Sequence, residues 1–200
     1  MPRTGLTSDE IVAEAAQLSD EIGYEALTMG LLAERLRMRA PSLYKHVESL
    51  ADLQHRIATL AMTELGDELR DAMQGKAELE ALSALLSATR SYVTAHPGRY
   101  TATIGAEFAG PDDPLFVAGA RVIDSIAAVL RGYGIRDDET DHAIRALRCT
   151  VHGFATLLAA NAFQWNADPE ESFAWMIQFI DRGLRASGAP AGQAGRAKAR

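Results

Sequence analysis

Residues 28–53 read TMGLLAERLRMRAPSLYKHVESLADL. Its apolar residues recur at steps of three and four, which indicates helices rather than strands. Thr28 can cap a short helix through Arg35, and Pro41 fits the first turn of the next helix, where its missing N–H costs nothing. The link between them, residues 36–39, has the length of the turn in a helix-turn-helix. The sequence therefore predicts this motif.

The second helix of the pair has one inward and one outward face. Leu43 and Val47 are four residues apart and point to the core, which leaves the polar residues between them toward solvent. Hydroxyl, phenol, ammonium and imidazole groups can meet phosphate oxygens or base edges, and Ala40 and Pro41 can touch a thymine methyl group. The residues predicted to contact DNA are Thr28, Arg37, Arg39, Ala40, Pro41, Ser42, Tyr44, Lys45 and His46.

The charge of this segment differs from that of the whole chain. The formal net charge of the 200 residues is -7, and residues 8–34 contain seven acids and no lysine or arginine. Residues 35–47 contain three arginines, one lysine and no acid. A basic run alone is more often a solvated surface, so the DNA-binding interpretation depends on its coincidence with the paired helices.

Helical patterns extend to both sides of the motif. Thr7 and Glu10 form a capping box for a first helix that runs to about Ile22, and Gly23 is a stop signal. Ser49 and Asp52 are a weaker capping pair for a long fourth helix. Further helices are expected over about 79–95, 100–106, 116–130 and 141–163, and from Pro169 onward. The fold class is therefore all-α.

The helix expected over 141–163 is apolar on two faces. Such a helix must be covered from two sides, and small residues such as Gly153 permit close approach of another helix. The alternative is that both faces are buried within one chain. The predicted dimer interface contains Thr150, Gly153, Leu157, Phe173, Met176, Ile177 and Ile180.

Composition excludes several classes of protein. Residues 1–10 have no signal-peptide core, and no apolar run has the length of a membrane span, which favours a cytoplasmic protein without a membrane partner. Cys149 is the only cysteine, so an intramolecular disulfide or a cysteine-based zinc site is excluded. The five histidines lack metal-ligand spacing, so no metal or cofactor is expected.

With LAERL (32–36), APSLYKHV (40–47) and the apolar spacing of the next helix, the first 60 or so residues resemble the N-terminal domain of TetR-family transcriptional regulators. HPGRY (96–100) and residues 151–173 resemble one C-terminal subgroup. The resemblance implies a homodimer on a near-palindromic operator, usually a repressor, with a C-terminal domain that binds a small-molecule effector.

Two positions depart from the family pattern. Arg37 stands where glycine is common in the turn, so a non-glycine residue is expected at positive φ, at a cost of about 1 kcal/mol. Leu50 stands where a lysine often contacts phosphate, and Arg37 or Arg39 is expected to compensate. Fewer phosphate contacts would give a smaller dependence of DNA affinity on salt.

An effector can change DNA affinity only if it favours one conformation, and the fourth helix, which joins the two parts of the chain, is the expected connection. An effector pocket would be largely apolar with few polar anchors. The candidate lining residues are Tyr92, Tyr100, Glu107, Phe108, Phe116, Arg121, His152, Phe154, Phe163 and Trp165. Each of them alone is more often plain core or surface.

The expected organisation is a DNA-binding domain over 1–48, an effector-binding and dimerisation domain over 49–186, and a disordered tail over 187–200. An all-helical hydrolase or metal-carboxylate bundle is the first alternative, but the sequence lacks a Glu-x-x-His pair, a nucleophile elbow and a phosphate-binding glycine loop. A helical adaptor with an incidental basic segment is the second.

Overall fold

The computed structural model describes residues 6–188, and every regular element in that range is helical. The helices divide into two compact units. The first contains the chain up to Asp67 together with Tyr92–Val122, and the second contains Glu68–Ser91 and the chain from Ile123 onward. The boundary expected at residue 48 thus differs from the division in the structure, because later helices pack with the N-terminal ones.

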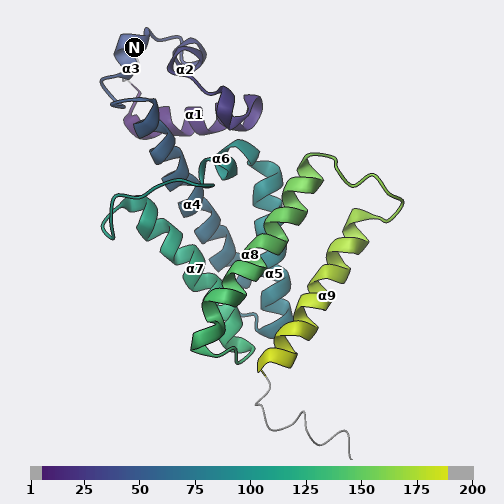
Figure 1. Ribbon diagram of the computed structural model, residues 1–200. Helices are drawn as coiled ribbons and strands as arrows, with labels where there is room; N and C mark the ends of the chain where they lie inside the picture. Colours follow the sequence, from purple (N-terminus) through teal and green to yellow (C-terminus); the bar gives the residue numbers. More distant parts are fainter. Residues whose placement is uncertain (1–5, 189–200) are drawn as a thin grey trace, which may run out of the picture. The chain divides into compact units, whose positions relative to one another are not determined.

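The first unit begins with α1 (Ser8–Ile22), a 3-10 turn (Tyr24–Ala26), α2 (Met29–Arg35) and α3 (Ala40–Leu43). Figure 1 shows these elements grouped at the first turns of α4 (Leu50–Met73). The capping box of Thr7 and Glu10 forms as the sequence predicts. The core of the unit includes Ile11, Leu32 and Leu43, none of which has exposed surface.

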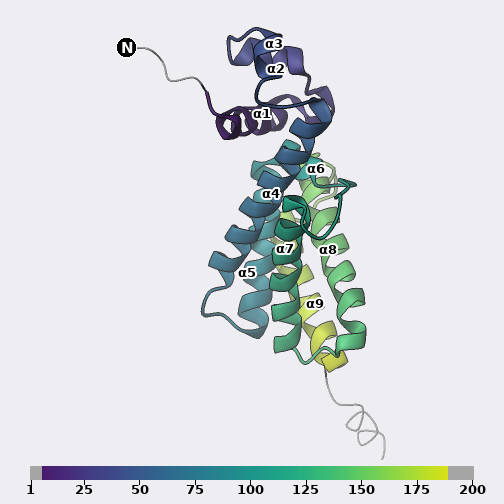
Figure 2. The same cartoon turned by 90° about the vertical axis from the view of Figure 1, so that its left-hand side faces the viewer.

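A later helix, α6 (Pro97–Ala102), packs against α1 in the same unit, as Figure 2 shows. A short helix was expected over 100–106, but α6 begins three residues earlier because Pro97 occupies its first turn. Ala102 from α6 and Leu115 from the start of α7 (Pro114–Gly132) join the core of the N-terminal helices.

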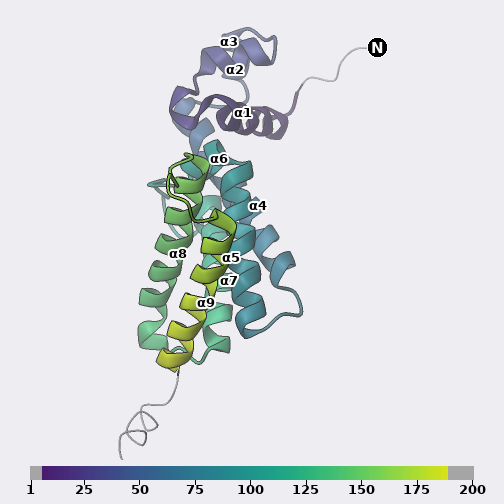
Figure 3. The same cartoon turned by 90° about the vertical axis from the view of Figure 1, so that its right-hand side faces the viewer.

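The second unit contains most of α5 (Glu78–Ala95), the later part of α7, α8 (Asp137–Ala159) and α9 (Pro169–Gly188). Figure 3 shows α8 and α9 side by side. α8 begins and ends four residues before its expected bounds, and Asn161 at φ 52 follows its C-terminus. α9 continues through Ser187 and Gly188, which were expected in the tail, and residues 189–200 of that tail lie outside the described residues.

Candidate nucleic-acid interface and the surfaces around it

In the helix-turn-helix, a side-chain cap begins α2 and a tight turn ends it. The hydroxyl of Thr28 accepts a hydrogen bond from the N–H of Leu31 at 3.2 Å, which confirms the predicted cap. At the other end, the N–H of Met38 donates to the carbonyl of Ala33 at 2.9 Å, so the chain reverses over Arg37. Arg37 has φ 53, the left-handed conformation expected from its place in the turn.

The orientation of α3 follows from two buried anchors. Leu43 has no exposed surface and Val47 has 1%. Tyr44, which lies between them, is 52% exposed. The helix expected to carry Val47 is shorter than predicted, because α3 ends at Leu43 and residues 44–46 form a turn. The two anchors still leave the phenol of Tyr44 on the outer surface of the unit.

The predicted DNA contacts all lie in the first unit and on or beside the helix-turn-helix. Their exposure varies. The exposed ones are Thr28, Arg37, Arg39, Pro41, Tyr44 and Lys45. The partly buried ones are Ala40, Ser42 and His46.

One cation of the basic segment does not face outward. Arg35 pairs with Glu14 at 3.2 Å and with Glu21 at 2.5 Å, both on α1. The guanidinium of Arg35 lowers the pKa of Glu21, chiefly through their hydrogen bond. Arg35 thus joins α2 to α1, whereas Arg37, Arg39 and Lys45 are exposed.

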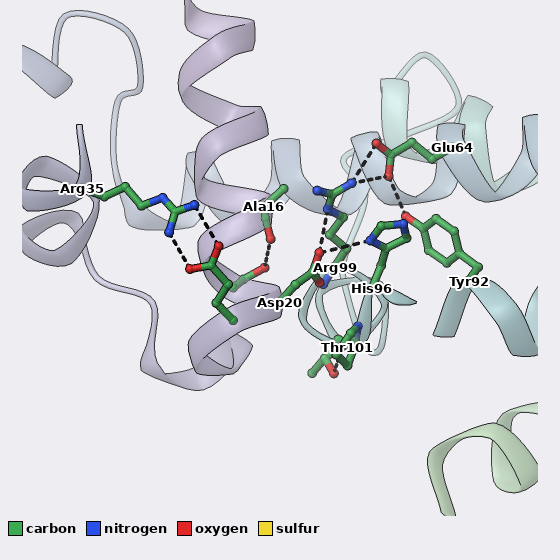
Figure 4. A network of polar contacts seen from close by, with 11 residues as sticks. Ala16, Asp20, Arg35, Glu64, Tyr92, His96, Arg99 and Thr101 are labelled. Carbon is green, nitrogen blue, oxygen red and sulfur yellow. Dashed lines mark hydrogen bonds and ion pairs between the residues drawn. The ribbon is translucent and has the colours of Figure 1, made fainter. Parts of the chain in front are cut away.

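A polar network joins α1, α4, α5 and α6 within the first unit (Figure 4). The carboxylate of Asp20 accepts a hydrogen bond from the backbone N–H of Arg99 at 2.8 Å and lies 3.3 Å from Nδ1 of His96. The guanidinium of Arg99 lies 2.9 Å from Asp20 and 3.1 Å from Glu64. α6 is therefore held to α1 and α4 by one arginine.

Tyr92, a candidate effector contact, belongs to this network. Its hydroxyl donates to Glu64 at 2.8 Å, and the side chain is 1% exposed. Burial, and then the charge of Glu64, raises the pKa of Tyr92. The sequence indicated none of these contacts, because the partners are far apart along the chain.

The structure separates the predicted effector residues into two sets. Those in the first unit are Tyr92, Tyr100, Glu107, Phe108, Phe116 and Arg121. Those in the second unit are His152, Phe154, Phe163 and Trp165. Within the second unit, the ring of Phe154 contacts those of Phe163 and Phe173 in tilted arrangements, with centroids 5.0 Å apart.

The second unit also contains an open groove between α5, α9 and the end of α4. Its volume is about 870 Å³, and small side chains such as Ser83, Ala84, Ser87 and Ala88 form most of its wall. None of the predicted effector residues lines it.

The predicted dimer interface is corrected at two positions. Phe173 and Ile177 are only 4% and 7% exposed, and Phe173 lies under the guanidinium of Arg90, with 4.2 Å between Cζ and the ring centroid. They face α5 within one subunit and offer no surface to a partner. Met176 and Ile180 are partly buried.

The exposed face of α9 contains two aromatic residues that were not in the predicted interface. Trp175 and Phe179 are 62% and 58% exposed and stack with centroids 5.2 Å apart. On α8, Thr150 and Leu157 are exposed, and a Cβ on Gly153 would meet nothing within 4 Å. The spacing of four between Trp175 and Phe179 is the signal that could have identified this face.

Residues 82–180 match the family model described as the tetracyclin repressor-like C-terminal domain. The HTH-type transcriptional regulator YobS of Bacillus subtilis is 30% identical over 187 residues, which cover 92% of this chain and 95% of the relative. The chain belongs to the TetR family of transcriptional regulators.

Two further proteins are similar to this TetR-family chain over most of its length. The HTH-type regulator Rv0681 of Mycobacterium tuberculosis is 31% identical, over 90% of this chain and 82% of the relative. The solved structure of the TetR-family protein ActR of Streptomyces coelicolor has a TM-score of 0.72 at 21% identity, over 94% and 100% of the two chains. The all-α fold class expected of a TetR-family protein is confirmed.

None of the helices in residues 6–188 combines the length and the apolar character that a membrane crossing requires. In the same residues, no three histidine, cysteine, aspartate or glutamate side chains gather as metal ligands would.

Proposed function

We propose that this TetR-family chain is a homodimeric repressor that binds a near-palindromic operator and is released by a small-molecule effector. It acts as a cytoplasmic DNA-binding protein and not as an enzyme. Each subunit inserts α3 into the major groove, where Tyr44 and its neighbours meet base edges. Phosphates are held by the exposed cations of the turn and by the backbone N–H groups at the start of α2.

The observation that supports DNA binding best is the exposed phenol of Tyr44, which directly follows α3 and lies between the buried anchors Leu43 and Val47. A side chain 52% exposed between two buried anchors contributes little to the core. Arg37, Arg39 and Lys45 are exposed around it, and no ion pair joins them to an acid within residues 6–188. An aromatic hydrogen-bonding group surrounded by unpaired cations is suited to a nucleic acid surface.

The proposed homodimer is supported by the exposed aromatic pair on α9. Trp175 and Phe179 are large, and an exposed apolar patch of this kind marks interaction surfaces. The small-residue face of α8 at Gly153 is suited to close approach of a second subunit. A dimer would present two copies of α3 to two half-sites.

Effector control is supported by the family and by α4. The similar protein ActR has been solved in complex with actinorhodin. α4 is one helix of 24 residues, whose first part belongs to the DNA-binding unit and whose last part belongs to the second unit. A conformational preference imposed by a ligand can therefore reach the helix-turn-helix through a continuous element.

The test begins with a pool of random duplexes from which the protein selects its own site. Tyr44→Ala should retain the fold by circular dichroism and lose discrimination at one or two base positions, at about 1–3 kcal/mol each. Lys45→Ala should weaken binding to all sequences and reduce the slope of log affinity against log salt by about 0.9.

The matched control is Lys76→Ala, which removes an exposed lysine from the second unit and should change neither quantity. Weak binding by the unmodified protein without sequence preference would refute the proposal and favour a helical adaptor.

A further inference from the structure

The turn that joins α3 to α4 is held by side chains of α4. After Leu43, the N–H of Val47 donates to the carbonyl of Leu43 at 3.1 Å, and the Val47 side chain is buried. The two peptide groups that flank Val47 are the carbonyl of His46 and the N–H of Glu48. Both form hydrogen bonds with side chains and not with backbone groups of a helix.

Two residues of α4 make these bonds. The carboxylate of Asp52 accepts a hydrogen bond from the N–H of Glu48 at 2.8 Å. The guanidinium of Arg56 donates to the carbonyl of His46 at 3.3 Å. Asp52 and Arg56 are themselves joined at 2.8 Å, one turn apart on α4. We call these two side chains the elbow pair.

The charge states of the elbow pair match this arrangement. Burial acts to raise the pKa of Asp52, but the hydrogen bond from Glu48 and the guanidinium of Arg56 outweigh it and leave the pKa lowered. Asp52 is therefore ionised at neutral pH. Its bond to the backbone is charge-assisted, and such bonds are stronger than those between neutral groups.

A surface role does not account for this geometry. An exposed ion pair one turn apart on a helix contributes little by itself. In the elbow pair, each side chain also forms a hydrogen bond with a backbone group that lies after the C-terminus of the recognition helix. The hydroxyl of Ser8, at the start of α1, adds a second donor to the carbonyl of His46 at 3.3 Å.

We propose that Asp52 and Arg56 are positioning residues for sequence reading, which fix the angle between α3 and α4 and thereby the pose of Tyr44. This inference rests on the proposed function and concerns residues that touch no base. A site must be held within a fraction of an ångström to discriminate between bases, so a looser turn reduces specific affinity more than non-specific affinity.

Asp52→Asn distinguishes this role from a simple charge effect, because the two predict opposite changes in the affinity for the selected duplex. If Asp52 acted only as a negative charge near DNA, its neutralisation would strengthen binding to every duplex. As a positioning residue, the amide loses the charge-assisted bonds, and specific binding should weaken by about tenfold. Binding to a scrambled duplex should stay unchanged or become slightly tighter.

The experiment measures dissociation constants for the duplex selected by the unmodified protein and for a scrambled duplex, at several salt concentrations. Arg56→Gln should reduce the ratio of specific to non-specific affinity without changing the salt slope. A slope smaller by about 0.9 would instead identify Arg56 as a phosphate contact and overturn the proposal. Equal or tighter specific binding by Asp52→Asn would overturn it as well.

A charge swap tests whether the backbone bonds matter. Asp52→Arg combined with Arg56→Asp retains opposite charges one turn apart, but arginine cannot accept from the N–H of Glu48 and aspartate cannot donate to the carbonyl of His46. The swapped protein should be as defective as Asp52→Asn. Recovery of specific binding would mean that the ion pair alone is sufficient, which contradicts the proposal.

Two variants complete the set. Arg136→Gln removes an exposed arginine that pairs with Asp138 and Glu139 at the start of α8, and it should leave the affinity ratio unchanged. Ser8→Ala removes the second donor to His46 without a change of charge and should cause a smaller loss in the same direction. If Asp52→Asn does not fold, Ser8→Ala still tests the proposal, because unchanged specific binding by that variant would contradict it. If the unmodified protein selects no duplex, the proposed function fails and this inference fails with it.

Discussion

The carboxylate of Asp20, on α1, caps α6 because it accepts a hydrogen bond from the backbone N–H of Arg99 at 2.8 Å. This contact and the ion pairs of Arg99 join the end of α1 to α6. A helix that follows α4 and α5 in the chain is thereby part of the unit that contains the helix-turn-helix.

The first prediction concerns the backbone approach beside this cap. A Cβ added to Gly98 would lie 2.0 Å from the carbonyl oxygen of Ser19, which is main chain and cannot rotate away. Gly98→Ala should therefore lower the free energy of unfolding by about 1–3 kcal/mol. Urea denaturation measures this change.

Gly119→Ala is the matched control, since Gly119 lies within α7 and a Cβ there would meet nothing within 4 Å. It should be stabilising by about 0.5–1 kcal/mol, because alanine is favoured over glycine in a helix. Equal effects of the two substitutions would contradict the proposed close contact of α6 with α1.

The second prediction concerns the turn of the helix-turn-helix. Arg37 has φ 53, so Arg37→Gly should raise the free energy of unfolding by about 1 kcal/mol through relief of strain. The same substitution at Arg39, where φ is -81, should lower stability because glycine there only adds freedom to the unfolded chain. Thermal unfolding of the two variants measures both changes in stability. Stabilisation by both substitutions would contradict the proposed backbone strain at Arg37.

The third prediction concerns oligomeric state. Trp175→Glu should give monomers in sedimentation and abolish operator binding at the same time, because half-sites need two subunits. Trp165→Glu changes a tryptophan that is 72% exposed outside α9, and it should leave the dimer intact. Ile177→Glu should instead unfold the protein, since that side chain is buried within the subunit. A monomer that still binds the operator tightly would contradict the proposed dimer.

The fourth prediction concerns acid stability. Asp181 is buried on α9 and accepts bonds from the hydroxyl of Tyr133 at 2.6 Å and from Arg185 at 3.1 Å. Burial acts to raise the pKa of Asp181, but the bonds from Tyr133 and Arg185 outweigh it and lower the pKa. A pKa lower in the folded than in the unfolded chain stabilises the fold above about pH 4, and this stabilisation is lost as the pH falls through the folded-state value.

Asp181→Asn should therefore be less stable than the unmodified protein at pH 7, and the difference should narrow below about pH 4. Urea unfolding at both pH values measures it. Asp124→Asn, which changes an exposed carboxylate on α7, should show neither effect. A difference that does not depend on pH would mean that Asp181 stabilises the fold through its shape alone.

The sequence predicted local features well because each of them is determined by residues that are close together in the chain. The capping box of Thr7 and Glu10, the cap at Thr28 and the positive φ of Arg37 each depend on a few neighbouring residues. The predicted set of DNA contacts followed from the same kind of spacing, and every member lies on or beside the motif.

The sequence failed where the answer depends on which helix covers which face. The apolar spacing of α9 identified Phe173 and Ile177 as one face, but not that this face packs within the subunit while Trp175 and Phe179 are exposed. The contacts of Arg99 with Asp20 and Glu64 join residues 79 and 35 positions apart, and no local pattern encodes them.

The packing of α6 on α1 has a consequence for protein engineering. A chimera made by cutting at residue 48 and grafting the N-terminal piece onto a relative would leave Ser19 and Asp20 facing a foreign α6, whose residue at position 98 need not be glycine. The transferable module is discontinuous and includes Pro97–Ala102. Under the proposed function, exchange of operator specificity between relatives requires either that both segments are transferred together or that only the exposed residues on and beside α3 are replaced.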